Sequence, residues 1–274
     1  MNKITSILVK ELRDRTGMGI MECKQFLTDA CGDIELAIDN MRKSGQIKVA
    51  KKSLRIVKEG IIITNVNKNY TYGVNIELNC ETDFFAKSQE FNKFGQQISN
   101  YAIKNRITSI EHILSKFNNK LKLLIAKVGE NIQISRFNVL EGENISFYMH
   151  GTRIGVLLSI SAKIYNKRII KNISMHIAAM NPEFINKDSI PEDLLAHERK
   201  LQIDMISKTY KTKEILKKII NERMKKFIVN LSLVNQYFIM NSSKTVGQIL
   251  KENNIHINNF IRFEIGEKLK NNFR

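Results

Sequence analysis

The run Glu81-Thr82-Asp83-Phe84-Phe85 holds groups able to cap a helix, carry charge and bury apolar surface in a partner. Both phenylalanines cannot face one core from regular structure, since successive side chains diverge by about 180° in a strand and about 100° in a helix. In one interpretation Thr82 or Asp83 is a helix N-cap and both rings lie in the core. In the other, Phe84 is an exposed wedge with the Asp83 carboxylate beside it.

A second run with two interpretations is Thr16-Gly17-Met18-Gly19-Ile20-Met21. Its glycines are typical of a turn between two helices. Two exposed apolar residues flanking such a turn would instead form an edge where another protein docks.

Sequence patterns of catalysis and metal binding are absent. The chain has no GxGxxG, Walker A, HExxH or GxSxG sequence, and its histidines are scattered at 112, 150, 176, 197 and 256. Cys23, Cys31 and Cys80 show no CxxC spacing, which argues against a zinc site or a disulfide framework. We therefore expect a protein that is not an enzyme and has no cofactor of its own, with Cys23 and Cys80 as small buried apolar residues.

The N-terminal residues 4–45 show the spacing of three short helices, with Gly32 expected as the C′ residue of the second. Residues 46–60, rich in Lys and Val, are interpreted as a linker. A bundle of about forty residues has a small hydrophobic core, and we expect contacts with the rest of the chain or with a partner to stabilise it.

From Gly60 onward the apolar period changes to two. Alternation through Val74, Ile76, Leu78 and Cys80 predicts a half-buried strand in a hairpin, followed by a helix over about 89–104. The order of hairpin and helix recurs 82 residues later, over 145–160 and the helix through Ile169–Ile177. The fold class is therefore α+β, with a core of two related subdomains.

Two helices are predicted within residues 191–227, joined at 207–213, and such a charged helical hairpin is typical of a projecting arm. The following domains are expected: 1–55, three helices with a linker; 56–142, the first core subdomain; 143–190 with 228–274, the second; 191–227, the hairpin arm.

Net charge is +17, from 44 Lys and Arg against 27 Asp and Glu. A positive net charge of this size indicates a nucleic-acid partner only where the basic residues cluster. Each of five consecutive segments (1–60, 61–150, 151–190, 191–227 and 228–274) carries only +2 to +4, and the chain is rich in Ile, Asn and Lys throughout. The even spread favours compositional drift, although a basic RNA-binding or ribosome-associated protein stays as the alternative.

Charges interrupt the N-terminal residues before any signal-peptide core develops, and no apolar run approaches the ~18 residues of a membrane span. We expect a cytoplasmic protein that does not bind membranes.

Two segments resemble the signatures of bacterial elongation factor Ts: LRDRTGMGIMECK over 12–24 and ELNCETDFFAK over 77–87. The similarity continues through KVGEN (127–131), HGTRIGV (150–156), RMKKF (223–227), SKTVGQIL (243–250) and FIRFE (260–264). Phe26 and Phe85 depart from the family, which usually has small or β-branched residues there.

The resemblance implies a guanine-nucleotide exchange factor that binds elongation factor Tu, promotes GDP release and supports translation elongation. It implies a ubiquitin-associated-like N-terminal domain and a hetero-oligomer with the partner, which itself binds GDP, GTP and Mg²⁺. No specific nucleic acid is expected.

By the same resemblance, the Thr82, Asp83, Phe84 and Phe85 motif enters the G domain, with Phe84 as the wedge and Asp83 disturbing the Mg²⁺ site. Weaker partner contacts are implied for five further residues: Arg13, Ile20, Met21, His150 and Arg153. For His150, a role as a locally bonded turn residue is an equal alternative.

Overall fold

The computed structural model describes residues 4–41, 55–161, 166–206 and 213–267 of the chain. It divides into two compact units, unit 1 with Met1–Ile61, Ile76–Phe137 and Ile265–Arg274, and unit 2 with Ile62–Asn75 and Asn138–Glu264. Most of the predicted linker (46–60) and of the connection at 207–213 lies outside the described residues. The four-part division predicted from the sequence stays a prediction.

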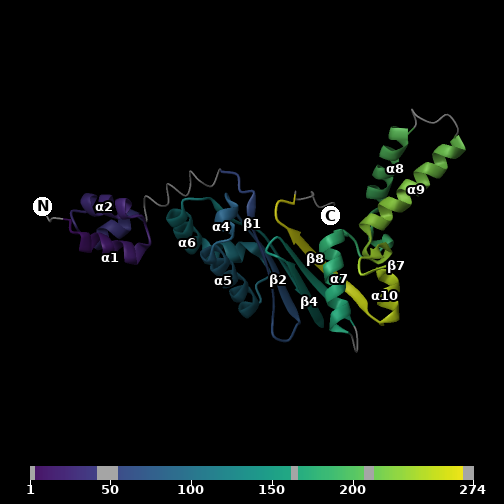
Figure 1. Cartoon of the computed structure of the whole chain (residues 1–274), viewed down its shortest axis with the longest axis horizontal. Coiled ribbons are helices and arrows are strands. Elements are labelled where there is room, and N and C mark those ends of the chain that lie inside the picture. The colour runs from purple at the N-terminus through teal and green to yellow at the C-terminus, as the bar shows by residue number, and fades with distance from the viewer. Residues whose placement is uncertain (1–3, 42–54, 162–165, 207–212, 268–274) are drawn as a thin grey trace. The chain divides into compact units, whose positions relative to one another are not determined.

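The N-terminal part of unit 1 contains α1 (Ser6–Thr16), α2 (Ile20–Asp29) and a further helical stretch at 34–41 (Figure 1). The predicted three helices are thus present in the described residues. They enclose a small buried cluster of Val9, Leu12, Cys23, Leu27, Ala30, Ala37 and Met41.

The end of α2 differs from the prediction by one residue. Cys31 (φ 53°) is the left-handed C′ residue, and Gly32 (φ 90°) follows it at C″. The amide of Gly32 donates to the carbonyl of Leu27 (2.8 Å) and that of Cys31 to the carbonyl of Thr28 (3.1 Å). These two bonds form a Schellman motif, which satisfies the last carbonyls of the helix.

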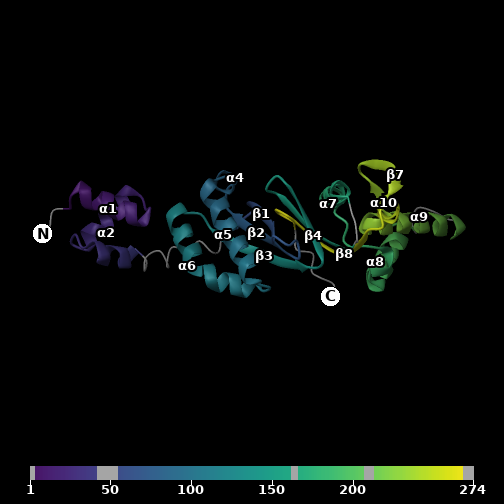
Figure 2. The same ribbon diagram turned by 90° about the horizontal axis from the view of Figure 1, so that it is seen from below.

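Unit 1 also holds α4, α5 and α6, which follow the second strand of a three-stranded sheet of order β1-β2-β3. Their bounds are α4 Asp83–Ala86, α5 Gln89–Asn105, α6 Ile110–Val128, β1 Glu59–Val66, β2 Tyr72–Cys80 and β3 Ile132–Glu141. Helices α5 and α6 lie side by side (Figures 1 and 2), with edge-to-face contact between Phe94 and Phe117. Strands β1 and β2 contribute residues to both units.

The prediction that the strand ending at Cys80 is half-buried is wrong, because all nine residues of β2 are buried. Its polar side chains have partners: Asn75 donates to the carbonyl of Gly155 (3.0 Å), and Glu77 pairs with Arg136. Buried polar groups are tolerated when they are hydrogen-bonded or paired. The alternation of apolar and polar residues in β2 therefore belongs to a strand with both faces covered, and not to a strand with one face exposed to solvent.

Unit 2 is built on a second three-stranded sheet of order β4-β5-β8, whose strands are antiparallel. Helix α7 packs on β4 and β5 (Figure 1). The elements are β4 Asn144–His150, β5 Ile154–Ser161, α7 Lys167–Met180, α10 Val246–Glu252 and β8 His256–Glu264. The predicted hairpin over 145–160 and the helix that follows it are confirmed.

Helices α8 (Glu192–Ile206) and α9 (Lys213–Leu231) pack on each other through Ile206, Ile220 and Met224. A short hairpin that the sequence did not predict, β6 (Tyr237–Phe238) and β7 (Asn241–Thr245), follows α9. The remaining elements are the 3₁₀ turns η1 (Lys187–Ser189) and η2 (Leu233–Asn235). Among the described residues, none of the helices is long and apolar enough to cross a membrane.

Candidate functional site

The run from Glu81 to Phe85 lies where β2 ends and α4 begins. Thr82 is the N-cap of α4, with extended backbone, and its Oγ1 accepts a hydrogen bond from the amide of Phe85 (3.2 Å). Capping is the usual role of Thr at this position. The capping part of the first interpretation is therefore correct.

The two adjacent phenylalanines have opposite environments. Phe85 is 6% exposed and its ring lies 5.0 Å from that of Phe91 on α5, whereas Phe84 is 85% exposed. An exposed ring beside a buried one follows from the roughly 100° turn per residue in a helix. The structure thus places Phe84 as an exposed ring, and the prediction that both rings lie in the core is wrong.

The loop after α6 holds the start of α4. Glu130 accepts hydrogen bonds from the Thr82 amide (3.0 Å) and from the Thr82 hydroxyl (2.7 Å). In return, the amide of Asn131 donates to the carboxylate of Glu81 (2.6 Å). The four residues Glu81, Thr82, Glu130 and Asn131, here named the reciprocal clamp, join two segments nearly fifty positions apart in the sequence.

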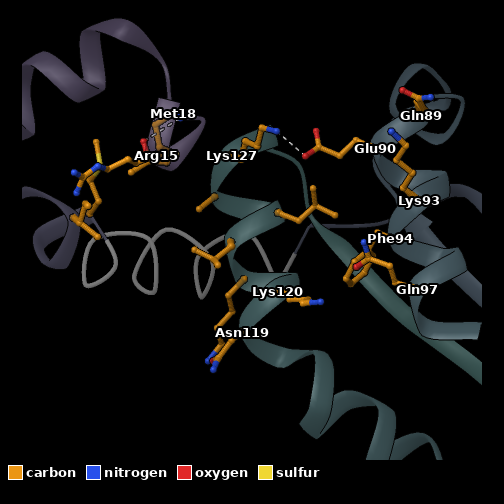
Figure 3. A pocket seen from close by; sticks show the side chains of 17 residues that line it. Arg15, Met18, Gln89, Glu90, Lys93, Phe94, Gln97, Asn119, Lys120 and Lys127 are labelled. Carbon is orange, nitrogen blue, oxygen red and sulfur yellow. Dashed lines mark hydrogen bonds and ion pairs between the residues drawn. The ribbon is translucent and has the colours of Figure 1, made fainter. Parts of the chain in front are cut away.

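The end of α6 is itself fixed to the start of α5. Lys127, in the last turn of α6, forms an ion pair with Glu90 in the first turn of α5 (2.7 Å; Figure 3). Gly129 then ends α6 with a left-handed φ of 85°. This conformation suits Gly and turns the chain toward the clamp.

Asp83 forms an exposed ion pair with Lys87 one helical turn later (2.7 Å). The hydrogen bond from Lys87 and its positive charge hold the pKa of Asp83 below its ordinary value. The same pair raises the pKa of Lys87. Asp83 is therefore a carboxylate at neutral pH and is accessible beside Phe84.

Both cysteines of the similar segments are buried, as predicted. Burial raises the pKa of the Cys80 thiol to about 12, and the negative charge of Glu130 adds to this effect. Burial also raises the pKa of Cys23. Thiols of this kind are inert as nucleophiles.

The turn between α1 and α2 exposes the residues predicted there. Gly17 is left-handed (φ 68°) and closes α1, while Gly19 is the N-cap of α2 with ordinary extended backbone. Ile20 and Met21, in the first turn of α2, are 53% and 74% exposed. Arg13 lies exposed in the last turn of α1.

His150 and Arg153 flank the turn between β4 and β5, and both are exposed. The Tyr148 hydroxyl lies 3.2 Å from Nδ1 of His150, and the Arg153 amide donates to the His150 carbonyl (3.4 Å). His150 therefore has the local bonding of a turn residue and also faces solvent.

The structure brings Thr82, Asp83, Phe84 and Phe85 together on one turn. Glu130, Asn131 and Lys87 also belong to this site, although they were not among the residues predicted for it. KVGEN, over 127–131, was the available signal, since a Gly followed by a carboxylate and an amide is typical of a bonded loop. Within the parts of the chain that are described, no group of three His, Cys, Asp or Glu could hold a metal ion.

Comparison with known proteins identifies the family. Residues 81–267 match the family described as Elongation factor TS. The chain is 50% identical over 270 residues to Elongation factor Ts of Sodalis glossinidius (98% of this chain, 94% of the relative). It is 48% identical to that of Photorhabdus laumondii (98% and 95%) and 49% identical to that of Yersinia pestis (97% and 93%). Matches of this extent show that the chain belongs to the elongation factor Ts family.

Proposed function

We propose that this chain is a guanine-nucleotide exchange factor that binds elongation factor Tu and promotes the release of GDP during translation elongation. The observation that carries the proposal is the exposed Phe84, with the Asp83 carboxylate beside it, on a fixed turn of a chain that belongs to the elongation factor Ts family. A large exposed apolar ring on a rigid turn is a typical anchor for a partner pocket.

In this account Phe84 inserts between elements of the partner's G domain. Burying a phenylalanine side chain contributes about 1.5–3 kcal/mol. Thr82 and Phe85 hold the turn, through the cap and through packing on Phe91. The rigid turn lets the ring act on the partner without a large loss of its own conformational entropy.

Asp83 places a negative charge at the site that the partner uses for Mg²⁺ and phosphate. Mg²⁺ neutralises the charge of the β-phosphate in the bound nucleotide. Disturbing that ion weakens GDP binding. Because binding free energies are reciprocal, a factor that prefers the nucleotide-free partner must lower its GDP affinity by the same ratio.

Secondary contacts are proposed at two surfaces. Arg13, Ile20 and Met21 contact the G domain from the turn between α1 and α2. His150 and Arg153 contact the partner's third domain from the turn between β4 and β5. Exposure of all five side chains supports these assignments.

The proposed activity converts no substrate and needs no cofactor in this chain, since GDP, GTP and Mg²⁺ belong to the partner. The chain acts in a hetero-oligomer with elongation factor Tu, and its place of action is the cytoplasm.

The test is the release of fluorescently labelled GDP from purified elongation factor Tu, with and without the chain. The expected result is release accelerated by one order of magnitude or more at micromolar chain, saturating with concentration. Unchanged release at saturating chain would rule out the proposed function.

A further inference from the structure

Glu130 makes two hydrogen bonds to one residue of the proposed wedge turn. Its Oε2 accepts from the Thr82 amide (3.0 Å) and its Oε1 from the Thr82 hydroxyl (2.7 Å). Bonds to an ionised carboxylate are about twice as strong as neutral ones. Glu130 is half-buried, whereas Thr82 and both of these bonds are exposed.

These bonds also orient the Thr82 hydroxyl. A hydroxyl has one hydrogen to donate and two lone pairs to accept with. Since the hydrogen points to Glu130, the lone pairs remain for the Phe85 amide, which is 3.2 Å from Oγ1. Glu130 thereby selects the capping orientation of Thr82.

The turn depends on such help because α4 has only four residues, Asp83–Ala86. One helical turn is unstable alone, since nucleation costs more than a single hydrogen bond returns. Phe84, at 85% exposed, cannot be fixed by its own packing. Its direction is set by the capping residue Thr82, two positions before it, and by the buried Phe85 directly after it.

Glu130 is well placed to serve as a fixed support. The residue before it closes α6, and Asn131 after it is buried and donates both to the Glu81 carboxylate (2.6 Å) and to the Arg55 carbonyl (2.7 Å). Lys127, three residues earlier, is tied to Glu90 on α5. The support is thus anchored on both sides.

We propose that Glu130 is a positioning residue for nucleotide exchange: its carboxylate holds the Thr82 cap, and the cap aims Phe84 at the partner. This inference rests on the proposed function. Glu130 acts through Thr82 and needs no contact with the partner. Removing it lowers the rate of GDP release more than it lowers affinity or stability, because the remaining contacts of the chain are unchanged.

The experiment compares Glu130→Ala, Glu130→Gln, Thr82→Val and the Ala/Val double variant in the full-length chain. For Glu130→Ala and for Thr82→Val we expect a maximal GDP-release rate about 10-fold lower, with the half-saturating concentration changed by less than about 3-fold. Glu130→Gln, whose amide retains one acceptor oxygen, falls between Glu130→Ala and wild type.

The double variant separates a shared pathway from two independent defects. If both residues act through one contact, the double variant is no more than about 2-fold slower than the worse single variant, whereas independent effects would multiply to about 100-fold. Glu252→Gln is the matched control, because Glu252 also uses both carboxylate oxygens, toward Lys244 (2.6 and 2.8 Å), and lies outside the proposed site. Its release rate should equal wild type.

Amide hydrogen exchange on the free chain supplies a readout without the partner. In Glu130→Ala the Thr82 and Phe85 amides should exchange at least about 10-fold faster, with the amides of β2 unchanged. Equal acceleration throughout β2 would mean general destabilisation and would overturn the positioning role. A wild-type release rate in Glu130→Ala would overturn it as well.

The two proposals fail in distinguishable ways. If the wild-type chain leaves the rate of GDP release unchanged, both the proposed exchange function and the role of Glu130 in it are contradicted. If wild type accelerates release and Glu130→Ala does so equally, only the role of Glu130 is contradicted.

Discussion

Phe84 and Phe85 show how one turn of helix gives two identical side chains different tasks. Phe85 contributes packing against Phe91, while Phe84 contributes nothing to the core and presents its ring to solvent. The division depends on the Thr82 cap, which fixes where the helix starts and therefore which ring faces inward. A shift of one residue would exchange the two environments.

The first prediction compares alanine at these two positions. Phe85→Ala should lower the free energy of unfolding by about 3–5 kcal/mol, because it leaves a cavity against Phe91. Phe84→Ala should change it by less than about 0.5 kcal/mol, since an exposed ring is lost. Urea unfolding followed by circular dichroism measures both values. A large loss for Phe84→Ala would mean that its ring is structural.

Buried polar residues were the least predictable individual positions. The sequence showed Glu77 as a polar residue of an alternating strand, which predicts exposure. Its burial requires the guanidinium of Arg136, a residue 59 positions later, and no local pattern announces that pairing. The exposed Phe84 was predictable only as one of two alternatives, because the choice rests on the tertiary position of the cap.

At the scale of elements, the short β6–β7 hairpin is fixed by a histidine of α7. The Ile239 amide donates to Nδ1 of His176 (3.3 Å), and Nε2 of His176 lies 2.9 Å from Oε1 of Gln236. Only neutral imidazole can accept at Nδ1 while donating at Nε2. Burial correspondingly lowers the pKa of His176.

The second prediction is a loss of stability in acid. Because the pKa of folded His176 lies below its unfolded value near 6.5, its full contribution is present above pH ~6.5 and is lost as the pH falls toward the folded pKa. The maximal slope is about 1.4 kcal/mol per pH unit. Urea unfolding between pH 7.5 and 5 measures it. An equally steep fall in His176→Gln would contradict the assignment to this residue.

The third prediction concerns the close approach of β5 to the β1–β2 hairpin within unit 2. A Cβ atom at Gly155 would lie 2.2 Å from Oγ1 of Thr64 and 2.5 Å from Cγ2 of Ile62. Gly155→Ala should therefore destabilise the protein by about 1–3 kcal/mol through overpacking. Thermal unfolding checks the value. An unchanged midpoint would show that these strands separate at little cost.

Long periodic elements were predictable and special positions were not. The expected helix over 89–104 matches α5 within one residue. Choosing Gly32 as the left-handed residue of α2 failed because the Schellman bonds require a left-handed C′ residue, and that position falls on Cys31. The β6–β7 hairpin has one strand of two residues, too short for a period.

At the scale of the whole molecule, the charge of +17 is the least specific feature of the chain. The proposed contacts include only two arginines, Arg13 and Arg153, of the 44 basic residues, and therefore do not explain it. A basic surface still attracts polyanions without specificity. It also speeds encounter with acidic partners at low salt.

The fourth prediction separates this background from true RNA binding. Filter binding to generic RNA should give dissociation constants weaker than about 1 μM at physiological salt, as for nonspecific binding. Tight binding with a steep salt dependence would revive the alternative of an RNA-binding or ribosome-associated protein. The measurement uses wild type across a salt series from about 50 to about 300 mM, which reports the slope of binding against ionic strength.

The proposed function as a whole depends most directly on Phe84. The decisive measurement is the rate of labelled GDP release from elongation factor Tu at saturating chain, for wild type, Phe84→Ala and the folded control Glu252→Gln. The fifth prediction is that wild type and Glu252→Gln accelerate release equally, while Phe84→Ala is at least about 10-fold slower, the loss of about 1.4 kcal/mol of differential binding. Release by Phe84→Ala as fast as by wild type would contradict the account.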